Sequence, residues 1–101
     1  MPDKPRGYRL ARAAKADLAA IWQYTLRNWS PEQADKYLRA ITDACASLAA
    51  GDRTGRRAEA PRGYEKLPVG SHVIWFRRGE DRLEIVRVLH LRQDVDRNLP
   101  S

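Results

Sequence analysis

The sequence predicts a single α+β domain in which a pair of helices covers a β-sheet. Two stretches in the first half repeat apolar residues every three or four positions, which is typical of helices with one buried face. Short strand-like segments separated by Gly-containing turns follow and indicate an antiparallel meander. We expect the order β-α-α-β-β-β, with an antiparallel helix hairpin packed on one face of a mainly antiparallel four-stranded sheet.

The first two elements are a strand and a helix. Residues Tyr8–Arg12 alternate moderately after Pro5 and Gly7, which favours a short strand. The period then changes over Ala13–Trp29, and we expect both tryptophans of this face in the core. The face carries Ala14, Leu18, Ile21, Trp22, Thr25 and Trp29. Neither Ala11 nor Arg12 has a side chain that accepts from the first helical amides, so this helix should lack a side-chain cap.

The second helix has the clearest local signals. Ser30 suits the N-cap, Pro31 the first helical position and Gln33 a capping box. Gly51 is placed to end the helix. The buried face should consist of Ala34, Tyr37, Leu38, Ile41, Cys45 and Leu48. Because almost no linker separates the two helices, they should run antiparallel.

The second half of the chain should form the rest of the sheet. Residues 52–63 are expected to be a loop rich in arginine, with Arg53, Arg56, Arg57 and Arg62. The strand candidates after it are Tyr64–Leu67, His72–Arg78 and Leu83–His90. Residues 1–101 form one domain, and 1–7 and 95–101 are expected to be flexible tails.

Composition narrows the class of protein. No apolar run approaches the ~20 residues of a membrane helix, and the polar N-terminus has no secretory signal. The single cysteine, Cys45, excludes an internal disulfide and fits a reducing cytoplasm. With 19 Lys+Arg against 13 Asp+Glu, the net charge of +6 favours an acidic partner, such as nucleic acid, a nucleoprotein machine or an acidic protein.

Several short motifs, in this order and spacing, carry a resemblance to a known family. They are Tyr8-Arg9-Leu10, Ala16-Asp17-Leu18, Ile21-Trp22-Gln23-Tyr24-Thr25, the run from Gly63 to Arg77, and Ile85-Val86-Arg87-Val88-Leu89-His90. The chain resembles the ParE branch of the RelE/ParE toxin superfamily from Tyr8 to about Leu99. It departs from the family at Ala11, where a Ser or Thr often precedes the first helix.

This resemblance implies the toxin half of a type II toxin–antitoxin pair. The target would be DNA gyrase, trapped on cleaved DNA, so the bond chemistry would belong to gyrase and the chain would not be an enzyme. A ParD-like antitoxin would neutralise it in a hetero-oligomeric complex, with a disordered segment that folds around the toxin. Nucleic acid would be met only indirectly, through gyrase or the antitoxin. A weaker possibility is a protein with the toxin fold that has lost toxicity and serves as an interaction module.

The alternative from the same superfamily is a RelE-like, ribosome-dependent mRNA endoribonuclease. It would need Arg77 and Arg87 on the sheet face that helices leave open, with His90 as the proton carrier. His72 and Tyr64 are the other proton carriers nearby. Such ribonucleases resemble one another in a Tyr or His just after the last strand, and 91–101 contains neither. We therefore expect no catalytic residues.

A set of basic and aromatic residues is predicted to contact partners: Trp75, Arg77, Arg87, Arg56, Arg57, Arg62 and Arg92. Trp75 lies either in the core or on the open sheet face. Arg87, among apolar neighbours, either contacts a partner or pairs internally with Glu84 or Asp94. The loop arginines are most simply solvated charge. No Gly-rich phosphate loop, Ser-His-Asp order or metal spacing is present, so we expect neither cofactor nor metal.

Overall fold

The computed structural model describes residues 7–59 and 62–99. Within them, no helix is both long and apolar enough to cross a bilayer. The elements are β1 (Tyr8–Leu10), α1 (Arg12–Asn28), α2 (Pro31–Ala50), β2 (Arg56–Arg57), β3 (Glu65–Val69), β4 (His72–Arg78), β5 (Leu83–His90) and α3 (Val95–Asn98).

The strands form one mixed sheet in the order β1-β5-β4-β3-β2. β1 runs parallel to β5, and the other neighbours are antiparallel. The α+β class and the element order are confirmed, but the count of four strands is wrong because β2 lies within the predicted loop. β3 also continues through Pro68, where we expected it to end. Proline is tolerated there because β2 pairs only with Glu65 and Lys66, so Pro68 lies at a free edge.

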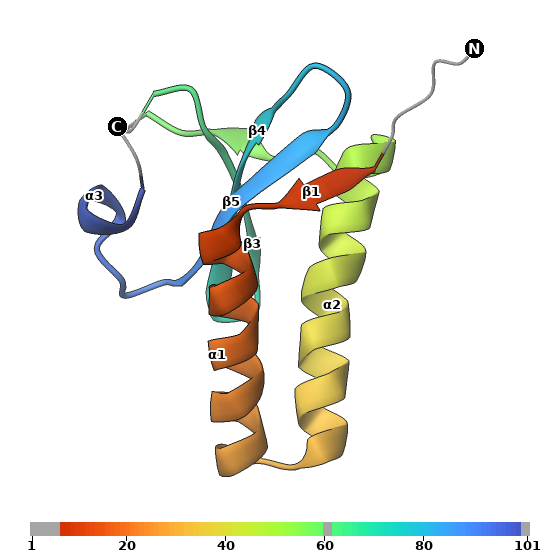
Figure 1. The fold of residues 1–101 in the computed structure, drawn as a ribbon, viewed down its shortest axis with the longest axis vertical. Coiled ribbons are helices and arrows are strands. Elements are labelled where there is room, and N and C mark those ends of the chain that lie inside the picture. Colours follow the sequence, from red (N-terminus) through yellow and green to blue (C-terminus); the bar gives the residue numbers. More distant parts are fainter. Residues whose placement is uncertain (1–6, 60–61, 100–101) are drawn as a thin grey trace.

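α1 and α2 form the predicted antiparallel hairpin on one face of the sheet, and their joined ends project beyond it (Figure 1). The Ser30 hydroxyl accepts from the Gln33 amide at 3.1 Å, and Gly51 ends α2 with φ of 86°, both as predicted. α1 has no side-chain cap, also as predicted. The main core between hairpin and sheet includes Leu18, Ile21, Ile41, Cys45, Leu48, Ile74, Phe76 and Ile85.

The first helix buries less than its pattern indicated. Trp29 is 71% exposed, so its predicted place in the core is wrong. The reason is that α1 ends at Asn28. Trp29 has non-helical dihedral angles, so the period of the helix does not determine where its side chain points. Trp22 is half-buried at the flank of the hairpin, where its indole N–H donates to Asp35 at 3.4 Å.

The opposite face of the sheet carries a second, smaller core. Its buried members are Ala58, Tyr64, Val73, Trp75, Val86, Leu89 and Leu99, with Val95 packed against them. Part of the segment that we expected to be a flexible tail lies against this face, since α3 spans Val95–Asn98 and Leu99 is 7% exposed. The predicted tail residues 1–6 and 100–101 lie outside the described residues. α3 and the segment around Ala58 also cover part of the face that we expected to be open.

Candidate functional site

The strand register brings together several of the predicted partner-binding residues. Arg56 of β2 lies opposite Lys66 of β3, Lys66 opposite Trp75 of β4, and Trp75 opposite Arg87 of β5. The Lys66 ammonium lies 5.4 Å from the centroid of the Trp75 ring. Trp75 itself is 4% exposed, which places it in the core rather than on an open face. The row therefore has exposed or half-exposed cations at its β2 and β3 end and keeps its aromatic ring covered.

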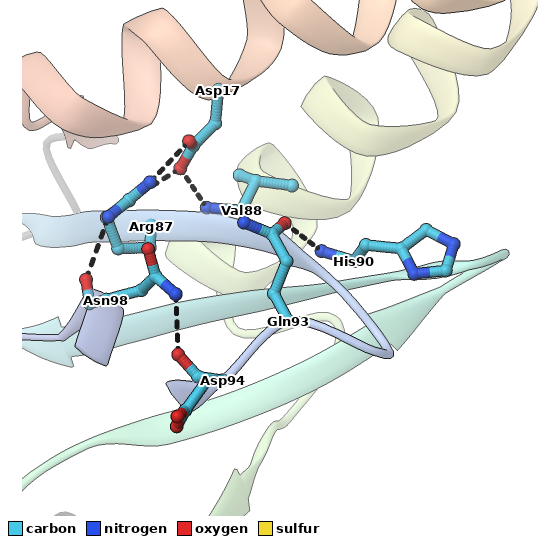
Figure 2. A network of polar contacts seen from close by, with 7 residues as sticks. All are labelled: Asp17, Arg87, Val88, His90, Gln93, Asp94 and Asn98. Carbon is cyan, nitrogen blue, oxygen red and sulfur yellow. Dashed lines mark hydrogen bonds and ion pairs between the residues drawn. The ribbon is translucent and has the colours of Figure 1, made fainter. Parts of the chain in front are cut away.

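Arg87 is held inside the protein by α1 and α3. Val86 is an extra residue in β5, since Phe76 lies opposite Ile85 and Trp75 opposite Arg87. The Arg87 guanidinium forms two hydrogen bonds to the Asp17 carboxylate, at 2.7 and 2.8 Å (Figure 2). It also donates to the Asn98 carbonyl at 2.8 Å. These contacts leave 19% of the Arg87 side chain exposed.

The pairing of Arg87 differs from both sequence-based alternatives. Its partner is Asp17, 70 residues away in the sequence, and not Glu84 or Asp94. The hydrogen bond to Asp17 raises the pKa of Arg87. Asp17 also accepts from the Val88 amide at 2.9 Å, at an edge of β5 that β1 does not reach. Asp17 thus accepts a hydrogen bond from an unpaired backbone amide of β5 and also neutralises Arg87. No local sequence pattern indicates this double role.

Arg77 is engaged with its neighbours on the sheet. Its Nε donates to Glu84 at 2.7 Å, which raises the pKa of Arg77, and its guanidinium lies 5.7 Å from the centroid of the Tyr64 ring. The next residue, Arg78, donates twice to Glu65, at 3.0 and 3.4 Å. The arginines of β4 therefore already neutralise the carboxylates beside them.

The two histidines form a separate cluster between α1, α2 and the end of β5. Nδ1 of His72 lies 2.7 Å from the Tyr37 hydroxyl, and Nδ1 of His90 accepts from the Arg92 amide at 3.1 Å. The two imidazoles meet edge to face at 5.2 Å. Burial, and then the neighbouring His90, lower the pKa of His72. A cavity of about 400 Å³ lies here, lined by Asp17, Ala20, Ile21, Tyr24, His72, Val88, His90 and Gln93.

The three residues that RNA cleavage would require do not meet. Arg77 and Arg87 line a cavity of about 390 Å³ next to α3, whereas His90 lines the cavity beside α1. Arg77 lies opposite Glu84, and His90 follows six residues later on β5, which corresponds to ~20 Å along a strand. A general acid or base must lie within hydrogen-bond reach of the group it serves, so this arrangement is not one catalytic site.

The remaining predicted residues occupy two other places. Arg56, Arg57 and Arg62 are exposed at the β2 edge, where Arg57 and Arg62 line a cavity of about 720 Å³ with Tyr64 and Glu65. Arg92 is exposed in the turn after β5. Within residues 7–59 and 62–99, the salt bridges do not include these arginines.

Three exposed apolar side chains were not predicted as candidates for partner binding. Tyr24 is 65% exposed, Trp29 71% and Leu91 62%. Tyr24 lies on α1 beside the histidine cavity, and Trp29 lies in the short connection between α1 and α2. For Tyr24 a signal existed, because it falls off the buried stripe of α1. Exposed aromatic residues are frequent anchors of protein interfaces.

The side chains that the structure describes favour neither a metal site nor a reactive thiol. In the part of the chain that the structure describes, His, Cys, Asp and Glu side chains form no group of three or more that could hold a metal ion. Cys45 is buried, and burial raises its pKa to about 12. Such a thiol is a core residue, since reactivity requires the thiolate.

Comparison with known proteins gives the family. A model of the ParE toxin of the type II toxin–antitoxin system parDE matches residues 8–95. Toxin ParE1 of Mycobacterium tuberculosis is 47% identical over 94 residues, which are 91% of this chain and 96% of that protein. Toxin ParE1 of Caulobacter vibrioides is 44% identical over 84 residues, 82% of this chain and 86% of that protein.

Solved structures agree in fold. A chain of the chromosomal ParDE system from P. aeruginosa superimposes with a TM-score of 0.74 at 27% identity, covering 85% of this chain and 96% of that one. A chain of the RelBE2 toxin–antitoxin complex of Mycobacterium tuberculosis has a TM-score of 0.54 at 19% identity, covering 91% and 98%, which shows the fold alone. The sequence matches along nearly the whole chain, together with the helix hairpin on a mixed sheet, show that the chain belongs to the ParE family of toxins of type II toxin–antitoxin systems.

Proposed function

We propose that this toxin inhibits DNA gyrase by stabilising the complex of gyrase with cleaved DNA, and that a ParD-like antitoxin neutralises it in the cytoplasm. In this mechanism the toxin binds and does not itself break bonds. The proposal is supported by its membership of the ParE family and by the net charge of +6, which suits a nucleoprotein target.

One structural observation favours binding over RNA cleavage. Arg77 and Arg87 are committed to Glu84 and Asp17, and His90 lies at a different cavity. A ribonuclease needs cationic groups free to stabilise phosphate charge, with an acid–base group beside them. The ribosome-dependent ribonuclease therefore remains only the alternative outcome of the tests below.

The helix hairpin is the surface we assign to the antitoxin. Tyr24 on α1 and Trp29 directly after it offer exposed aromatic area, and Ala20, Ile21 and Val88 are the apolar part of the lining of the cavity beside Tyr24. A segment that folds on binding can lay apolar side chains on such a surface and cover a large area. The complex of the P. aeruginosa ParDE system is consistent with an antitoxin partner for this chain.

The decisive experiment for the target is a plasmid assay with purified toxin and DNA gyrase. Supercoiling and the linear DNA released after protease treatment are both measured, with toxin unfolded in advance as the control. We expect loss of supercoiling and accumulation of linear DNA. Normal supercoiling in the presence of excess folded toxin would refute gyrase as the target. Loss of supercoiling without DNA breaks would refute the stabilised cleavage complex.

A second experiment tests the antitoxin surface. Tyr24→Ala and Trp29→Ala should each weaken binding of a ParD-like antitoxin by at least fivefold, about 1 kcal/mol. Lys36→Ala, on the exposed side of α2, is the matched control and should leave affinity unchanged. Equal affinity for all three variants would place the antitoxin elsewhere.

Cleaved mRNA in a translating extract, with gyrase unaffected, would instead support the ribonuclease.

A further inference from the structure

The free cations at the β2 end of the sheet form a surface that the proposed function does not use. We define the arginine edge as four exposed or half-exposed residues: Arg53, Arg56, Arg57 and Lys66. β2 is an edge strand, so its outer side faces solvent. Arg53 lies three residues before Arg56, within ~10 Å along the chain.

Among the described residues, the four cations of the arginine edge form no salt bridge. Glu65, the carboxylate of β3, lies opposite Arg57, but Arg78 donates to both of its oxygens. The acidic residues Asp52 and Glu59 are exposed, and in the described part of the chain neither forms a salt bridge with the arginine edge. The cations of the arginine edge thus have a carboxylate beside them, Glu65, that is already paired with Arg78.

Within the arginine edge, two cations directly oppose one another. Arg56 and Lys66 are cross-strand partners, and like charges in this position destabilise a sheet. Lys66 gains a partial compensation over the Trp75 ring, but Arg56 gains none from the described residues. An arrangement that opposes folding, at a solvent-exposed edge, points to a ligand that neutralises it.

The side chains around this edge favour a duplex nucleic acid over a protein. The large hydrophobic residues exposed in the described chain, Tyr24, Trp29 and Leu91, belong to α1, the hairpin end and the turn after β5, so the edge offers no apolar anchor for a protein interface. Single-stranded nucleic acid is bound by stacking on aromatic rings. Here Trp75 and Tyr64 are each 4% exposed and give no stacking platform. Binding to duplex phosphates requires only cations, because released counterions provide the driving force.

We propose that the arginine edge binds the phosphate backbone of duplex DNA directly, without sequence preference and without gyrase. The proposal goes beyond the proposed function, since the toxin would contact DNA itself. Arginine suits this contact because its planar fork can donate two hydrogen bonds to one phosphate.

The test measures binding of purified toxin to a fluorescent duplex of ~20 base pairs by anisotropy, as salt is raised. Four phosphate contacts predict a slope of about −3.6 in log K against log salt, so affinity should fall about 150-fold between ~50 and ~200 mM. The variant Arg53→Gln, Arg56→Gln, Arg57→Gln should have a slope near −0.9 and lose only about fourfold over the same range. Because gyrase is absent, this result is independent of the plasmid assay.

A matched variant separates local contact from total charge. Arg27→Gln, Lys36→Gln, Arg39→Gln removes three exposed cations from the helix hairpin and should keep the slope near −3.6. Equal slopes for the two variants would refute the proposal, since net charge alone would then explain binding. Self-association of the first variant with unchanged DNA affinity would also refute it. The arginines would then protect the sheet edge against pairing with a second chain.

Discussion

Removal of the Asp17 carboxylate should destabilise the fold more than any change on the surface. Asp17→Ala leaves the Arg87 guanidinium without its anion and the Val88 amide without an acceptor. Breaking a buried ion pair from one side costs about 3–5 kcal/mol. Because the Asp17 and Arg87 side chains keep 12% and 19% exposure, we take the lower end, about 3 kcal/mol, which lowers Tm by about 12–24 °C.

The assay is urea unfolding followed by tryptophan fluorescence and circular dichroism. Asp43→Ala, an exposed aspartate on α2, is the control and should change stability by less than about 0.5 kcal/mol. A double-mutant cycle with Arg87→Met should give a coupling of about 2 kcal/mol. A loss below about 1 kcal/mol for Asp17→Ala, or a coupling near zero, would show that the Asp17–Arg87 ion pair does not hold α1 to the sheet.

Three further predictions concern other parts of the molecule. The pKa of His72 is lowered in the fold, so below pH 6.5 the unfolded chain binds a proton more readily than the folded chain. The free energy of unfolding should therefore fall as the pH drops below 6.5. His72→Gln should lessen that fall, as measured by urea titrations at several pH values. Arg56→Glu places opposite charges across from Lys66 and should raise the unfolding free energy by about 0.5 kcal/mol while weakening DNA binding. In thermal unfolding Trp29→Ala should cost under about 0.5 kcal/mol, and Trp75→Ala about 3–5 kcal/mol.

The fold could be predicted where local chemistry and period agree. Ser30 begins α2 and Gly51 ends it, as expected. The Ser30 oxygen accepts from a free amide of the first turn, and glycine readily adopts the left-handed conformation that ends a helix. β2 could not be predicted, since two residues show no period. It also depends on Gly55, where an added Cβ would approach Phe76 to 2.5 Å. That contact joins distant parts of the sequence and has no local signal.

The candidate site was predicted less completely than the fold. Residue type alone correctly marked Arg87 as unusual, but its partner came from α1, which sequence spacing does not bring near β5. Trp75 had two possible faces, and the packing of α3 decided between them. The same packing includes Val95 and Leu99 of the segment predicted as a tail. In each case the deciding contact spans a long stretch of sequence, so only the folded chain defines it.

The two surfaces assigned to partners lie at opposite parts of the sheet. The antitoxin surface follows the helix hairpin and the cavity between α1 and β5, whereas the arginine edge lies on β2 and β3 and in the segment before β2. Three strand spacings separate β5 from β2, ~14 Å in all, and an extended segment needs about four or five residues to span them. A peptide confined to the hairpin would therefore leave DNA affinity intact. An antitoxin that abolishes DNA binding must continue around the end of the sheet, or carry acidic residues to the arginine edge by another route.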